Sequence, residues 1–229
     1  MDCTSEILLC QPDSGKGCSV CCGLFNFKDI SRESLTSFLQ KPIPSPAETE
    51  DDQYGTSYLY RNDIRDVTSH ICPYQGFLSE GKPGCRIHPA VCGKDNRDHS
   101  LFGKTICDRF LCPAHRILDN REKIYLTKYV RDWYCYSIAI IDPGTFSWII
   151  QEITRKYSIK DCDDYLITDV LENALSLHAK YMNSTEQALF YYSVPEYISH
   201  RELFWAGAET TSAENERKEI RRIVSILFE

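Results

Sequence analysis

Hydrophobic residues in the second half of the chain recur every three or four positions, which is the period of an amphipathic α-helix. Asp142 and Pro143 provide an N-cap and a first-turn proline for one such helix. Thr211 and Glu214 form the sequence pattern of a capping box for another. The pattern predicts four helices, over residues 120–138, 142–157, 163–181 and from 211 onward.

The first half of the chain is much less periodic. One short helix is predicted over residues 31–40, where Ser31 provides the N-cap and Leu35 and Leu39 share one face. Residues 41–57 combine three prolines with an acidic run and few large apolar side chains, so they predict an exposed loop.

Residues 72–116 are rich in glycine, proline, cysteine and histidine. No regular element longer than a turn or two is predicted there, and we find no convincing strand alternation in the sequence. We therefore expect a mainly α protein, in which an irregular cysteine-rich metal-binding lobe (1–118) packs against a helical lobe (119–229). A segment that buries so little hydrocarbon needs another source of order, and bound metal supplies it by coupling binding to folding.

Composition narrows the function. The chain has 229 residues, 42% of them hydrophobic, so an ordinary core is possible without cross-links. Its net charge of -7 argues against nucleic acid or an anionic membrane surface as the main partner. The amino terminus lacks a signal-peptide pattern and no apolar run could cross a bilayer, so we expect a cytoplasmic protein. Clustered cysteines there hold metal or carry out redox chemistry, whereas a secreted chain would pair its twelve cysteines as disulfides.

Eight of the twelve cysteines fall in two blocks, residues 18–22 and 72–112. Adjacent side chains diverge, so either Cys21 or Cys22 is expected to join Cys18 in a site that the second block completes. The blocks are then predicted to meet in space and to close the 49-residue loop between them. Eight thiolates could complete two four-coordinate sites, or one site with four cysteines left for other roles. The predicted metal ligands are Cys18, Cys21, Cys22, Cys72, Cys85, Cys92, Cys107 and Cys112.

Three side chains outside these blocks are interpreted as core residues. Cys135 and Cys162 fall within helical patterns, where a free cysteine behaves as a small apolar side chain. His178 lies on the apolar stripe of the helix predicted over 163–181. None of the three is predicted to bind metal.

The sequence leaves the metal open between zinc and an iron–sulfur cluster. Zinc accepts four cysteines, or three cysteines and one histidine, and His88 and His115 lie among the cysteines as candidate nitrogen ligands. Cys72-Pro73 and Cys112-Pro113 are like the pair that closes a ferredoxin-type ligand run, which favours a [4Fe-4S] cluster. Between residues 72 and 116, seven basic residues against four acidic ones give a local charge of +3 that can offset thiolate charge.

The stretch CSVCCGLFNFKDISRESLTSF, followed by CPYQGFL and GCRIHPAVC, resembles the YkgJ-type cysteine-cluster family of zinc- or iron-chelating proteins. The resemblance covers about residues 15–115. Ser14 and Gly15 stand near the place of the family's first signature cysteine, for which Cys10 is the only nearby candidate. His88-Pro89 stands where the family carries an arginine-proline pair. Some members resemble the cysteine-rich part of flagellin lysine methylase, so the resemblance implies a [4Fe-4S] centre and a role in protein modification.

Three functions follow as hypotheses. The first is a metalloprotein that holds an iron–sulfur cluster, with the helical lobe as scaffold or partner surface. The second is a redox or protein-modifying enzyme that uses this centre. The third is a structural zinc module that presents the helical lobe to another protein. A nucleotide site at Gly103-Lys104-Thr105 is excluded, because a P-loop requires glycine where Asp98 stands.

Overall fold

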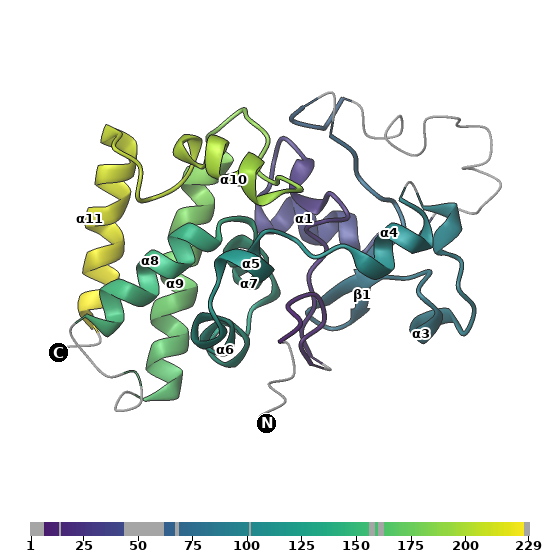
Figure 1. Cartoon of the computed structure of the whole chain (residues 1–229), viewed down its shortest axis with the longest axis horizontal. Coiled ribbons are helices and arrows are strands. Elements are labelled where there is room, and N and C mark those ends of the chain that lie inside the picture. The colour runs from purple at the N-terminus through teal and green to yellow at the C-terminus, as the bar shows by residue number, and fades with distance from the viewer. Residues whose placement is uncertain are drawn as a thin grey trace.

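Helices dominate the part of the chain that the computed structural model describes, and its only sheet there has two short strands. The mainly α prediction is therefore confirmed. Figure 1 shows the carboxy-terminal helices at one end of the molecule and the cysteine-rich hairpin and short helices at the other. The described residues are 7–13, 15–43, 62–66, 69–100, 102–155, 159 and 163–226.

The amino-terminal half contains short elements joined by turns. In chain order they are η1 (Leu24–Asn26), α1 (Arg32–Leu39), β1 (Gln75–Ser79), β2 (Lys82–Cys85), α3 (Pro89–Cys92), η3 (Arg97–His99), α4 (Gly103–Arg109) and α5 (Ala114–Ile117). The carboxy-terminal half contains the longer helices. They are α6 (Asn120–Tyr129), α7 (Trp133–Ile141), α8 (Pro143–Thr154), α9 (Asp164–Asn183), α10 (Val194–His200), η5 (Arg201–Leu203) and α11 (Thr211–Ser225).

Several predicted helix starts are confirmed by their caps. The Ser31 side chain accepts from the Ser34 N–H at the start of α1. Asp142 accepts from the Thr145 N–H at the start of α8. For α11 the cap is Thr210, one residue earlier than the predicted Thr211. Each cap satisfies a backbone N–H that has no partner within its helix.

The helix predicted over residues 120–138 is wrong, because the chain forms two helices there, α6 and α7. Asp132 lies between them and caps α7 by accepting from the Cys135 N–H at 2.9 Å. Glu172 of α9 accepts from the N–H groups of Arg131 and Asp132, both at 2.8 Å, and so fixes the turn. The tertiary contact with α9 stabilises a break that local periodicity does not reveal.

The absence of strands is also a wrong prediction. β1 and β2 form an antiparallel hairpin in which Gly76 pairs with Gly84 and Phe77 pairs with Pro83. Gly81 occupies the turn with a φ of +69°, a conformation that favours glycine. The strands are short and contain glycine and proline, so their sequences show no alternation of apolar and polar residues. Of the loop predicted over 41–57, residues 41–43 are exposed and the others lie outside the described residues.

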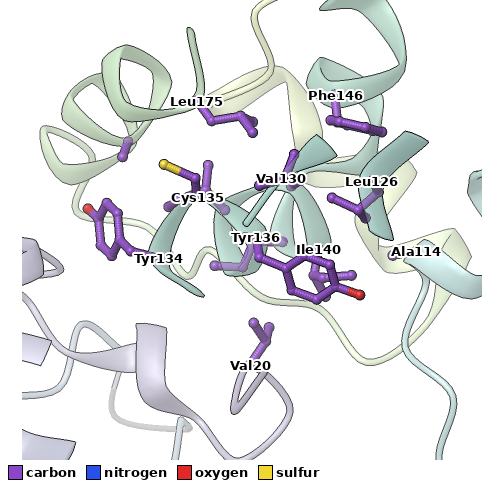
Figure 2. Close-up of a cluster of buried hydrophobic side chains, with 14 of the residues drawn as sticks. Val20, Ala114, Leu126, Val130, Tyr134, Cys135, Tyr136, Ile140, Phe146 and Leu175 are labelled. Atoms are coloured by element: carbon purple, nitrogen blue, oxygen red, sulfur yellow. The ribbon is translucent and has the colours of Figure 1, made fainter. Parts of the chain in front are cut away.

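One hydrophobic core runs through both halves of the described chain. α9 lies at its centre and packs against α6, α7, α8 and α11. Val20 belongs to the same core and lies beside Tyr136 of α7 (Figure 2). The Tyr136 hydroxyl donates to the carbonyl of Leu9 at 2.9 Å, and that of Tyr134 to the carbonyl of Ile30 at 2.8 Å. The lobe boundary predicted at residue 118 remains a prediction, and the regions on its two sides share buried contacts.

None of the described helices combines the length and the apolar character needed to cross a bilayer.

Candidate metal centre

The two cysteine blocks lie side by side. The Cys72 N–H donates to the carbonyl of Cys22 at 2.8 Å. The Gln75 side chain donates to both carbonyls, at 3.1 Å for Cys22 and 2.9 Å for Cys72. Gly23, which follows the first block, has a φ of +85°, and a Cβ there would lie 1.9 Å from the carbonyl oxygen of His70. Glycine at this position therefore allows the first block to approach the segment that leads to Cys72.

Four cysteines gather around the hairpin, and we call them the hairpin thiols. Cys22 and Cys85 pack against a small buried cluster that includes Cys72. Cys107 of α4 is exposed, and its Sγ lies 3.8 Å from Ser100 Oγ. Burial raises the pKa of Cys72 to about 12, and the charges of Cys85 and Cys107 add to the rise. The hairpin thiols are Cys22, Cys72, Cys85 and Cys107.

A second group of donors lies against α7, and we call it the amino-terminal group. Its members are Cys10, Cys18, Cys112 and His115. Cys10 Sγ lies 3.8 Å from His115 Nε2, and the Cys18 N–H donates to the Cys10 carbonyl at 3.1 Å. The His115 N–H donates to the Cys112 carbonyl at 3.0 Å. Burial raises the pKa of Cys112 to about 12, and the charges of Cys10 and Cys21 add to the rise.

Cys21 lies between the two groups. The thiol of Cys22 donates to its sulfur, which lowers the pKa of Cys21 and raises that of Cys22. We expected these adjacent side chains to diverge, but their sulfurs interact. The charge of Cys21 also raises the pKa of Cys10, in one group, and of Cys72, in the other. Cys21 is thus the one predicted ligand that neighbours both groups among the described residues.

Two candidates from the sequence lie elsewhere. Cys92 is exposed, and its thiol donates to the carbonyl of Lys94 at 2.9 Å, within its own turn. His88 Nδ1 accepts from the Ala90 N–H at 3.2 Å and caps α3. Both side chains have local roles, so we do not include them in either group. Cys3 and Cys162 lie outside the described residues.

Arg97 is the basic residue most closely connected with the hairpin thiols. Its side chain is buried, with 6% of the residue exposed. It donates to both oxygens of Asp95 at 2.9 Å and also forms an ion pair with Asp108. Its charge opposes the burial-driven rise in the pKa of Cys85. A cation held here can offset negative charge on neighbouring sulfurs.

The donor chemistry suits a soft metal, although the side chains are not yet in coordinating positions. Among the described residues, no three Cys, His, Asp or Glu side chains are arranged to hold an ion as they stand. All ten described cysteines are free thiols. Two buried polar atoms without hydrogen-bond partners, Ser19 Oγ and Gln75 Oε1, belong to residues beside or bridging the cysteine blocks. Because no three donors converge on one point and the cysteines are free thiols, metal binding requires some thiols to change rotamer and to lose their protons.

Two surface hollows lie away from both groups. One, of about 550 Å³, lies over α1 and is lined by Lys28 and Phe38 among others. The other, of about 240 Å³, lies between α9 and α11 beside Glu216. No cysteine lines either hollow. We therefore assign no substrate site to them.

Comparison of the chain with protein-family models, with curated proteins and with solved structures finds no match. The resemblance to the YkgJ-type cysteine-cluster family therefore remains a prediction from the quoted motifs.

Proposed function

We propose that this protein is a metalloprotein whose main centre is held by the hairpin thiols. The observation that carries the proposal is the contact between the two cysteine blocks, in which the Cys72 N–H donates to the Cys22 carbonyl at 2.8 Å. This bond brings together cysteines that are separated by 49 residues in the sequence. Cys85 packs beside them from β2, and Cys107 approaches from α4.

A four-thiol donor set suits both a [4Fe-4S] cluster and zinc, and we favour the cluster. Four thiolates carry more negative charge than one zinc ion neutralises, and the same holds for a cluster, so a nearby cation is useful in both cases. The charge of Arg97 lowers the pKa of Cys85 against the larger rise from burial, but Arg97 is paired with Asp95 and Asp108, so its charge favours this thiolate locally and is largely balanced by the two carboxylates. A bound cluster would provide one-electron chemistry, whereas zinc would provide structural stability alone.

The proposal extends to the location of the protein, its partners and the role of its helices. We propose a cytoplasmic protein that binds neither nucleic acid nor membrane, because its net charge is -7 and the ten cysteines that the structure describes are free thiols. The carboxy-terminal helices would serve as scaffold or as a surface for another protein. A redox or protein-modification role would follow if the centre is a cluster. A structural zinc module would follow if it is zinc.

Anaerobic purification of the full chain tests the proposal. We expect a brown protein with visible charge-transfer absorption and about four irons and four sulfides per chain. Cys85→Ser should lose most of this metal, whereas Cys92→Ser should retain it, because Cys92 lies outside both donor groups. A colourless protein with zinc would support the structural alternative. A folded chain with neither metal and all twelve thiols free would contradict the proposal.

A further inference from the structure

The amino-terminal group has the composition of a complete metal site on its own. It provides three sulfurs and one imidazole, from Cys10, Cys18, Cys112 and His115, without using a hairpin thiol. We infer that these four residues form a second, separate site that binds zinc. The inference extends the proposed function and rests on it, since it assumes that the chain's clustered thiols bind metal.

The spacing between two of the donors already suits zinc. In a tetrahedral site with Zn–S of about 2.3 Å and Zn–N of about 2.0–2.1 Å, a sulfur and a nitrogen ligand stand about 3.6 Å apart. Cys10 Sγ and His115 Nε2 lie 3.8 Å apart. These residues are 105 positions apart in the sequence, so local chain geometry does not impose this distance.

Backbone hydrogen bonds hold the other two donors beside this pair. The Cys18 N–H donates to the Cys10 carbonyl, which joins the two backbones, and the charge of Cys10 adds to the raised pKa of Cys18, so the two thiols are neighbours. The His115 N–H donates to the Cys112 carbonyl, which closes the Cys-x-x-His turn at the start of α5. Each half of the site is therefore a pair of donors fixed by its own backbone bond. The contact between Cys10 and His115 joins the halves.

The site lies against the core: Cys112 and His115 are buried, and Cys10 and Cys18 are half-buried. Four protein donors with no open position are typical of structural rather than catalytic zinc. Tyr136 of α7 is fully buried, and its hydroxyl donates to the Leu9 carbonyl, next to Cys10. Figure 2 shows its ring between Val20 and Ala114, which come from the two segments that carry the donors. Bound zinc would link residues 10–18 to α5 across a long stretch of chain, and such links restrict the unfolded state strongly.

Metal counting with matched variants tests the inference. We expect the full chain, loaded with zinc, to bind two ions, and His115→Ala to bind one fewer while Cys92→Ser keeps both. Cys85→Ser should lose the hairpin metal and keep the other zinc. If His115→Ala retains both ions, the second site does not exist. If His115→Ala loses all metal, the two sites are not separate and the inference is also wrong.

The absorption spectrum of the cobalt-substituted protein distinguishes ligation by His115 from a purely structural role, because only a change of ligand alters the charge-transfer band. His115→Cys should still bind cobalt at this site, and its sulfur-to-cobalt charge-transfer band should increase because sulfur replaces nitrogen. An unchanged spectrum would contradict ligation by His115. If Cys85→Ser retains all metal while His115→Ala loses one ion, the hairpin centre fails and the amino-terminal site stands.

Discussion

His178 is fully buried, and both of its ring nitrogens face carboxylates. Nδ1 lies 2.6 Å from Glu216 Oε1, and Nε2 lies 3.0 Å from Asp142 Oδ2. Burial alone would lower the pKa of His178, but the charge of Glu216 and the bonds to both carboxylates raise it to about 10. The imidazole is therefore charged at neutral pH. It joins α9 to α11 and to the start of α8. His178 is thus a core residue, but a charged one, which the apolar residues around it in the sequence do not predict.

This pair of contacts predicts a pH dependence of the folding free energy. Because the pKa of His178 is raised from 6.5 to about 10 on folding, its contribution is fully present below pH 6.5 and is lost as the pH rises toward 10. Urea unfolding of the metal-free chain between pH 6 and 10 should show this loss. Buried thiols with raised pKa values add to it in the same direction, so a variant is needed to separate them.

Glu216→Gln provides that separation. It removes the charge that raises the pKa of His178, so the loss of stability with rising pH should be smaller and should end at a lower pH than in the parent chain. At neutral pH we expect a loss of roughly 3–5 kcal/mol, because one partner of a buried charged pair is removed. Glu219→Gln, on the exposed side of the same helix, is the control and should match the parent. Identical pH profiles for Glu216→Gln and the parent would rule out this origin.

Cys10 and Cys92 illustrate which part of the site the sequence can predict. The concentration of cysteines points to metal chemistry, and it selects most of the thiols that gather in the structure. It cannot distinguish Cys92, whose thiol bonds to its own turn, from Cys10, which reaches His115 across 105 positions. That distinction depends on tertiary contacts, which cannot be predicted from the spacing of cysteines along the chain.

At the scale of secondary structure, the junction between α6 and α7 is fixed from three directions. Asp132 caps α7 and also pairs with Arg32 through two bonds of 2.6 and 2.7 Å. Glu172 accepts from the N–H groups on the other side of the turn. Asp132, which falls inside the single helix predicted over residues 120–138, therefore marks the boundary between two helices.

Replacement of Asp132 should test how much this junction contributes. Asp132→Ala removes both the cap and the partly exposed bidentate ion pair, and we expect a loss of about 1–3 kcal/mol in the free energy of unfolding. Asp132→Asn retains the cap and should lose less. Asp119→Ala, which removes only an exposed cap of α6, should cost about 1 kcal/mol. Equal losses for Asp119→Ala and Asp132→Ala in urea unfolding would show that the ion pair contributes nothing.

The elements that the sequence predicted well are those with a cap and a long apolar stripe. Asp163, for example, accepts from two N–H groups at the start of the 20-residue helix α9. The hairpin escaped prediction because its strands pair glycine with glycine and phenylalanine with proline. α10 was missed although its capping box, Ser193 with Glu196, is legible in the sequence. The cap was present in the sequence, but the helix is only seven residues long and has too few apolar residues to show a helical period.

At the scale of the whole molecule, the shared core predicts that the carboxy-terminal helices depend on the amino-terminal half. Val20 and Leu24 are buried in the same core as α7 and α9. A fragment of residues 119–229 would lack these side chains and would expose apolar core surface that they help to bury. We expect it to lose the cooperative thermal transition of the full chain, measured by circular dichroism. A transition at the parent temperature would show instead that the helices fold independently.

The order of synthesis gives this shared core a practical consequence. The cysteines of both donor groups precede α7 and α9 in the chain, so they leave the ribosome before these helices do. Until Tyr136 and the rest of α7 arrive, every thiol of the nascent chain is open to oxygen and to its neighbours. Slow induction, low oxygen and a supply of metal during expression should therefore decide how much of the product is recovered with its sulfur chemistry intact.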